Sequence, residues 1–166
     1  MIRRIILTTR FLNSAFRKVA EYQRRPLWRS IEATLIGGAF IAVGFNHFTD
    51  PHFFEAIVPR WFWSPSFANQ VSGAAEIFLG ATLIPIWTRR YSAWGLLVLL
   101  VLVYPANIDM FINDVGFATD EFGNTMRVEN MSGVFVRNLI RLPFQFVFAW
   151  LIWRHTRKTS SIHRER

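Results

Sequence analysis

Glu76 is the ionisable side chain whose surroundings point most strongly to chemistry, because it interrupts the apolar stretch VSGAAEIFLGATLIP. On a helix its face would also carry Gly73, Gly80 and Leu83, and small residues mark the side on which membrane helices pack. A charged carboxylate is costly in hydrocarbon. We therefore expect Glu76 to face the interior of a helix bundle, where it is protonated, paired or in contact with water.

Arg141 is the predicted partner of Glu76, since the two residues lie at similar depths in their apolar segments. Asn138 and Gln145 would extend a polar stripe on the helix face of Arg141. One interpretation is a structural ion pair that fixes the register of the helices, the commoner role of such pairs. The other is a ligand-binding or proton-exchange pocket floored by Glu76 and Arg141. Its remaining members would be Asn69, Gln70, Tyr104, Asn107 and Asn138.

A second cluster is predicted at the outer mouth of this pocket and consists of His47, Asp50, His52 and Asp109. Histidine and aspartate together can bind a metal or pass protons, but the spacing in NHFTDPH matches no zinc motif. We therefore predict no metal site. Asp50 followed by Pro51 is typical of a helix N-cap and first helical residue, which favours an interfacial cap with solvated histidines.

Four apolar segments would position these side chains, at residues 30–48, 68–86, 91–110 and 133–153. A helix rises ~1.5 Å per residue, so segments of this length match the ~30 Å hydrocarbon core of a bilayer. The last segment reaches that length only if it includes the polar residues Arg137, Asn138 and Arg141. The pattern therefore predicts four transmembrane helices.

Glycine and proline indicate how these helices pack. Gly37 and Gly44 in the first segment, and Gly73 and Gly80 in the second, predict close approach of helix backbones. Pro105 is predicted to kink the third segment and to free the carbonyl of Val101, which would place Asn107 and Asp109 beside the outer mouth.

The charge distribution predicts the topology. Lysine and arginine outnumber aspartate and glutamate by 19 to 11 and concentrate at both chain ends and at Arg89 and Arg90. The connections at residues 49–67 and 111–132 are acidic instead. The positive-inside rule then places both termini in the cytoplasm. A net charge of +8 distributed in this way suits the anionic lipids of a bilayer and argues against nucleic acid.

The expected organisation has three parts. Residues 1–28 are basic and amphipathic and are predicted to lie on the membrane surface as a helix, with a mitochondrial presequence as the alternative. Residues 29–153 form the four-helix membrane domain, and residues 154–166 form a basic cytoplasmic tail. The predicted fold class is all-α, a polytopic membrane protein built as a four-transmembrane-helix bundle.

The amino-acid composition excludes several kinds of catalytic and metal site. The chain is 52% hydrophobic and has no cysteine, which excludes disulfides, thiolate catalysis, cysteine-ligated zinc and iron–sulfur clusters. The sequence has no catalytic triad, phosphate loop or metal spacing, so it leaves open whether the protein is an enzyme. No cofactor is evident, and a quinone is the candidate that the predicted pocket would suit.

Three stretches read together resemble DoxX-like proteins, a family of small bacterial inner-membrane proteins. They are NHFTDPHFFEAIVP, VSGAAEIFLGATLIP and WGLLVLLVLVYPANIDMF, and the resemblance covers roughly residues 30–112. The matching positions are His47 and Pro51, Gly73 and Glu76, and Pro105 to Asn107. The resemblance implies a four-helix inner-membrane bundle, and some relatives are linked to quinone-dependent oxidation of sulfur compounds or to oxidative-stress complexes. The basic N-terminal extension and the acidic outer loop depart from the family pattern.

Three functions follow as hypotheses. The first is an accessory or small-ligand-binding membrane subunit, which would anchor a membrane or cytoplasmic protein partner through its basic ends. The second is a quinone-linked subunit of a membrane oxidoreductase, with proton exchange at Glu76. The third is a small-solute transporter, for which the chain shows no broken-helix repeat. The oligomeric state stays open, because glycine faces serve contacts within and between chains alike.

Overall fold

The computed structural model describes residues 27–157. The predicted surface helix in residues 1–28 therefore lies almost wholly outside the described residues, as does most of the predicted tail. Four long helices make up the bulk of the described chain, namely α2 (Leu27–Thr49), α4 (Pro65–Leu83), α5 (Arg89–Ile112) and α6 (Phe135–Trp153). Each coincides with one of the predicted apolar segments to within a few residues.

Three of these helices, α2, α5 and α6, are long and apolar enough to cross a membrane. Among the described helices α4 matches them in length, but it carries the polar side chains of Asn69, Gln70 and Glu76. Because α4 packs against both α2 and α5, part of its surface is covered by these two helices. Its sequence can therefore be less apolar than that of its neighbours.

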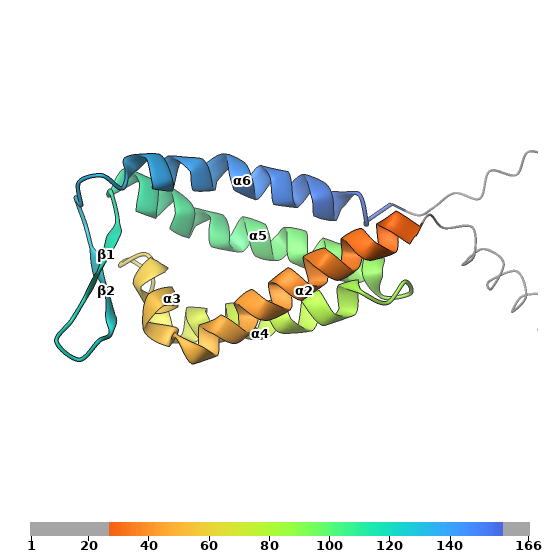
Figure 1. Ribbon diagram of the computed structural model, residues 1–166, viewed down its shortest axis with the longest axis horizontal. Coiled ribbons are helices and arrows are strands. Elements are labelled where there is room, and N and C mark those ends of the chain that lie inside the picture. The colour runs from red at the N-terminus through yellow and green to blue at the C-terminus, as the bar shows by residue number, and fades with distance from the viewer. Residues whose placement is uncertain (1–26, 158–166) are drawn as a thin grey trace, which may run out of the picture.

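The helices form two pairs (Figure 1). One pair is α2 with α4 and the other is α5 with α6, and α4 also packs on α5. The pairs converge where α2 begins and α6 ends, which we call the closed half, and they separate toward the open half, where α2 ends and α6 begins (Figure 1). The open half also carries a short helix and a β-hairpin.

Glycine sets the contact between α2 and α4. A Cβ atom on Gly37 would come within 2.5 Å of the carbonyl oxygen of Gly80, and one on Gly44 within 2.8 Å of that of Gly73. The two backbones therefore touch directly at two levels. This confirms the packing role predicted for these four glycines.

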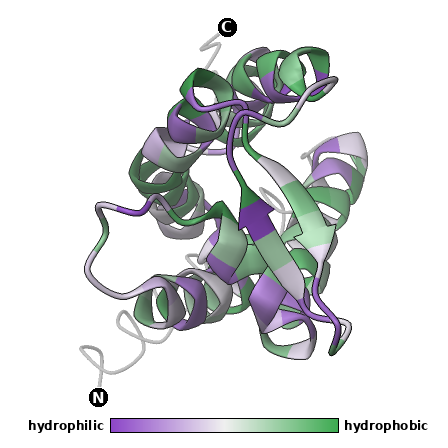
Figure 2. Ribbon diagram, turned by 90° about the vertical axis from the view of Figure 1, so that its left-hand side faces the viewer, coloured by the Kyte–Doolittle hydropathy of each residue, from purple (hydrophilic) through white to green (hydrophobic). Residues whose placement is uncertain are grey.

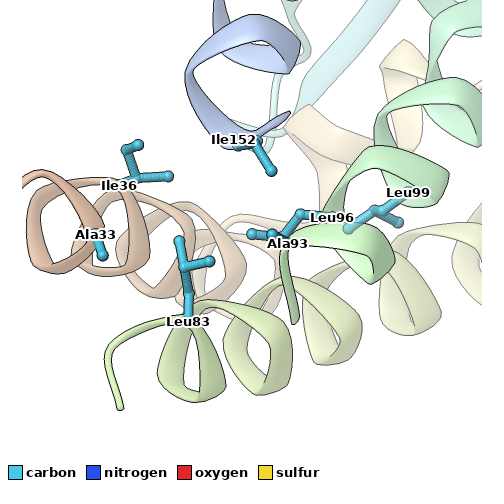
Figure 3. Packing of buried hydrophobic residues seen from close by; sticks show 7 residues of the cluster. All are labelled: Ala33, Ile36, Leu83, Ala93, Leu96, Leu99 and Ile152. Atoms are coloured by element: carbon cyan, nitrogen blue, oxygen red, sulfur yellow. The ribbon is translucent and has the colours of Figure 1, made fainter. Parts of the chain in front are cut away.

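An apolar core fills the closed half (Figure 3). Each of the four long helices contributes at least one buried side chain to it, and the members are Ala33, Ile36, Leu83, Ala93, Leu96, Leu99 and Ile152. Arg89 lies beside this core and ends α4, because its side chain donates hydrogen bonds to the carbonyls of Leu83 at 3.1 Å and Ile84 at 2.7 Å. The charge pattern suggested a basic hairpin of Thr88, Arg89 and Arg90 between these helices, but Thr88 is the N-cap of α5 and both arginines belong to its first turn.

The short helix α3 (Pro51–Ile57) follows α2 directly. The Asp50 carboxylate accepts a hydrogen bond from the backbone N–H of Phe53 at 3.3 Å, and Pro51 occupies the first turn. Both features confirm the predicted cap. Ser64 caps α4 in the same way, with Pro65 after it. A capped α3 is held across the open half, against α4 and the hairpin.

Residues 116–128 form an antiparallel hairpin of β1 (Gly116–Thr119) and β2 (Thr125–Val128), so the all-α fold class is wrong for this segment. Asp120 organises the turn, because its carboxylate accepts hydrogen bonds from the backbone N–H groups of Phe122 at 2.9 Å and Asn124 at 2.8 Å. These hydrogen bonds, the one to Asn124 foremost, lower the pKa of Asp120. Gly123 adopts φ +85°, a conformation that glycine allows at little cost.

Hydrophobic residues, drawn in green, make up much of the helices (Figure 2). Large hydrophobic side chains on α2, α5 and α6 stand more than half exposed, among them Leu35, Val101 and Phe146. A water-soluble protein rarely exposes apolar patches of such extent. This surface, together with three helices long enough to span a bilayer, is that of a membrane protein.

Candidate functional site

A cavity of about 1170 Å³ occupies the open half of the bundle, between the two helix pairs. Its walls are largely apolar and come from all four long helices, with α3 and the segment after it closing one side. The polar side chains that line it are His47, Asn69, Ser72, Glu76, Asn107, Arg137, Arg141 and Gln145. An apolar chamber with a few polar groups is the usual form of a small-molecule site.

His47 and Glu76 meet on the α2–α4 side of the cavity. Nε2 of His47 lies 3.5 Å from Oε2 of Glu76, and both side chains are about nine-tenths buried, at 9% and 12% exposed. The His47 ring stacks on Phe54 of α3 with centroids 3.8 Å apart, so α3 helps to fix its position. His47 therefore belongs to the cavity wall and not to a solvated outer mouth, which corrects the prediction.

Asn69 decides which ring nitrogen of His47 carries a proton. Nδ1 of His47 lies 2.7 Å from the side-chain oxygen of Asn69 and 3.1 Å from its backbone carbonyl oxygen. A backbone carbonyl can only accept, so Nδ1 must donate. The Asn69 amide in turn donates to the backbone carbonyl of His47 at 2.9 Å, which fixes the amide orientation.

The remaining contact, from Nε2 of His47 to Oε2 of Glu76, is favourable when one of the two groups carries a proton. That proton resides either on the carboxyl group or on the imidazole, and in both cases the pair as a whole carries no net charge. Oε2 of Glu76 is enclosed and has no hydrogen-bond partner among the described residues. The pair can thus donate or accept one proton at the cavity wall.

Arg141 is not the partner of Glu76, although both residues line the cavity. Among the described residues, the ion-pair contact of Glu76 is to His47, and Nη1 of Arg141 instead lies 3.1 Å from Sδ of Met110. The physical reason is the pairing of the helices. The glycine contacts bring α4 against α2, whereas α6, which carries Arg141, packs on α5.

Asn107 and Gln145 connect α5 to α6 around Pro105. The Asn107 amide donates to the side-chain oxygen of Gln145 at 2.6 Å, and the Gln145 amide donates to the backbone carbonyl of Leu100. Pro105 lies inside α5, which continues to Ile112. Asn107, which was predicted to lie near the kink at Pro105, is thus joined to Gln145 of the polar stripe predicted on the face of Arg141, and both side chains form part of the cavity wall.

Three predicted pocket residues do not line the cavity. Asn138 is fully buried, and its amide donates to the carbonyls of Met110 at 2.8 Å and Val115 at 3.0 Å, which satisfies the end of α5. The Tyr104 ring packs edge-on against Phe146, with centroids 5.5 Å apart. The Gln70 amide donates to the Ser66 hydroxyl at 3.3 Å.

The predicted outer-mouth cluster is not a single site. Asp50 caps α3, His52 is exposed on that helix, and Asp109 pairs with Arg127, whose Nη2 lies 2.5 Å from Oδ2 of Asp109. Residues 27–157 contain no group of three or more histidine, aspartate and glutamate side chains arranged to bind a metal.

Arg127 is a residue that sequence reasoning missed. From β2 it pairs with Asp109, donates to Glu129 at 3.0 Å and reaches the carbonyl of Val58 at 3.3 Å. One side chain therefore ties the hairpin to α5 and to the segment after α3, which closes the cavity. A lone arginine within an acidic connection was the signal that could have found it.

Comparison with known protein families gives a match. The model of a protein family, a domain of unknown function (DUF8561), matches residues 36–156. No curated protein matches the chain. No solved structure matches it. The matched range takes in most of the chain and every residue that lines the cavity, and the protein belongs to the DUF8561 family.

Proposed function

We propose that this protein is a ligand-binding or accessory membrane subunit whose cavity holds a small molecule with an apolar body and a polar head group. The observation that carries the proposal is the cavity itself, about 1170 Å³ of largely apolar space with its polar side chains gathered on a few wall positions. A chamber of this volume exceeds what water alone would stabilise between apolar walls. Its walls suit a lipophilic ligand instead.

In this proposal α4 is the fourth membrane span and the open half faces the outer side. The basic residues at the chain ends and at Arg89 and Arg90 support cytoplasmic termini, with anionic lipids as partners of the basic ends. The resemblance to DoxX-like proteins supports a bacterial inner-membrane location. Reporter fusions after Trp87, Asp120 and Arg166 test the topology and should read inside, outside and inside. A fusion after Arg166 that reads outside would refute the four-span topology.

A quinone-linked redox role is the second candidate, and the His47–Glu76 pair is the observation that favours it. A quinone gains or loses protons with its electrons, and this pair offers one exchangeable proton at the cavity wall. The described residues provide no redox group of their own, so the electrons would come from a partner protein. A transporter remains the third candidate.

Mass spectrometry of the organic extract from protein purified in mild detergent separates these functions. We expect one small lipophilic molecule to copurify with the wild type and to be lost or depleted in Glu76→Gln. The matched control is Glu121→Gln, the same chemical change at an exposed turn residue, which should retain it. If the molecule that copurifies is a quinone, the result supports the redox role. If it is redox-inactive, the result supports ligand binding without redox chemistry. If wild type and both variants carry only the bulk lipids, the ligand-binding proposal fails.

A further inference from the structure

Arg141 lines the cavity and has no acidic partner among the described residues. No carboxylate of a described residue forms an ion pair with its guanidinium group, and its one hydrogen bond is to Sδ of Met110 at 3.1 Å. A thioether sulfur is a weak acceptor, whereas the guanidinium carries five N–H donors. Most of the hydrogen-bonding capacity of Arg141 is therefore unused by residues 27–157.

Other arginines in the described chain are engaged differently. Arg127 pairs with Asp109 and Glu129, and Arg154 pairs with Glu32 at 3.0 Å. Arg137, the other arginine of the cavity wall, donates to the backbone carbonyl of Val115 at 2.9 Å. Neither of these two cavity arginines has a carboxylate partner among the described residues, but Arg137 donates to the backbone whereas the N–H donors of Arg141 are largely unused.

The part of the chain that the structure describes brings no free negative charge to the cavity that could balance Arg141. Of residues 27–157, only Glu76 contributes a carboxylate to the cavity wall, and that carboxylate lies against His47. With one shared proton the His47–Glu76 pair is neutral as a whole. A guanidinium among largely apolar walls is costly unless an anion joins it. A bound anionic molecule would supply that charge.

We propose that Arg141 binds the head group of a single-chain lipophilic carboxylate whose hydrocarbon body occupies the apolar cavity. This inference rests on the ligand-binding function proposed above and names the class of its ligand. A carboxylate supplies a negative charge beside Arg141, and its two oxygens fit the parallel N–H groups of arginine. The His47–Glu76 pair can supply a further hydrogen bond.

The test compares an acid with the alcohol of equal chain length. Full-length protein is placed in nanodiscs of phosphatidylcholine, and the binding of radiolabelled decanoate and decanol is measured at pH 7.5. We expect wild type to bind decanoate saturably and more tightly than decanol. Arg141→Gln should weaken decanoate binding by about tenfold or more, the order expected for loss of a charge-assisted hydrogen bond, and leave decanol nearly unchanged. Arg141→Lys should retain part of the preference.

The control is Arg90→Gln, which removes an exposed arginine in the closed half and should bind as wild type does. Equal binding of decanoate and decanol by wild type overturns the carboxylate inference but leaves the ligand-binding function standing, and this comparison needs no variant to fold. If wild type binds neither decanoate nor decanol, both the carboxylate inference and the ligand-binding function are overturned. Displacement of decanoate by a small fraction of phosphatidylglycerol in the disc identifies a membrane phospholipid as the occupant and also overturns the inference.

Discussion

The closed and open halves of the bundle are built from the same four helices but are filled in opposite ways. In the closed half, apolar side chains such as Leu83, Leu96 and Ile152 are fully buried. In the open half the helix pairs separate around a cavity, and capped or ion-paired elements span the gap. Stability is thus concentrated at one end, which leaves the other free to keep the space that binding requires.

The largest effect is expected from a substitution that forces apart the α2–α4 pair. Gly37→Ala would place a methyl group 2.5 Å from the carbonyl oxygen of Gly80, so the backbones must separate. We expect a loss of about 1–3 kcal/mol in the free energy of unfolding, the usual range for overpacking. The measurement is unfolding of the purified protein in detergent, followed by circular dichroism.

Gly38→Ala is the matched control, since nothing lies within 4 Å of the Cβ atom that it would add. It should be neutral, or stabilise the helix by up to ~1 kcal/mol through helix propensity. Equal destabilisation by the two variants would mean that the glycine contact does not hold the pair together.

A smaller effect is expected from the ion pair that fastens the hairpin. A double-mutant cycle with Arg127→Gln and Asp109→Asn should give a coupling energy of about 0.5–3 kcal/mol, because both side chains are largely buried. The comparison cycle is Arg60→Gln with Glu129→Gln, where the arginine side chain is 69% exposed. It should give less than ~1 kcal/mol. A larger coupling in the second cycle would show that the Arg127 contact is dispensable.

The smallest effect is a pH dependence that arises in the closed half. Burial is the largest cause of a lowered pKa at His155, which falls to about 4. The positive charges of Arg89, Arg29 and Arg154 add to it. The Glu32 carboxylate, 3.7 Å from Nε2, favours the proton but already pairs with Arg154, so burial prevails.

Because the folded protein binds this proton less readily than the unfolded chain, whose histidine pKa is ~6.5, acidification favours unfolding. The contribution of His155 to stability is present above pH ~6.5 and is lost as the pH falls toward 4. We expect the melting temperature in detergent to decrease between pH 7 and pH 5, and to decrease less in His155→Gln. An identical decrease in both proteins would assign the effect to other groups.

The positions of the four helices were predictable because apolar length and flanking charge are local signals. The cap of α3 was equally local, since Asp50 and Pro51 are adjacent in the chain. The hairpin could not be predicted, because its strands are only four residues each and its formation depends on the turn that Asp120 organises. Short strands in a polar connection carry little periodicity to detect.

Part of the cavity wall was also predictable, namely Glu76, Arg141, Asn69 and Asn107. Polar residues inside an apolar segment must face protein or water, which identifies them without knowledge of the fold. Their partners could not be found in this way. Depth along a helix says how far a side chain lies from the membrane surface, but which helix it faces depends on the packing of the whole bundle.

The direct contact between the backbones of α2 and α4 has a mechanical consequence. Where carbonyl oxygens rest against glycines, no side chains can rotate to let the helices slide, so the two helices should move as one rigid body. The α5–α6 side is joined through longer side chains such as Gln145, which can rearrange. The cavity thus has one stiff wall and one compliant wall, and any passage that admits a molecule from the bilayer should open on the compliant side.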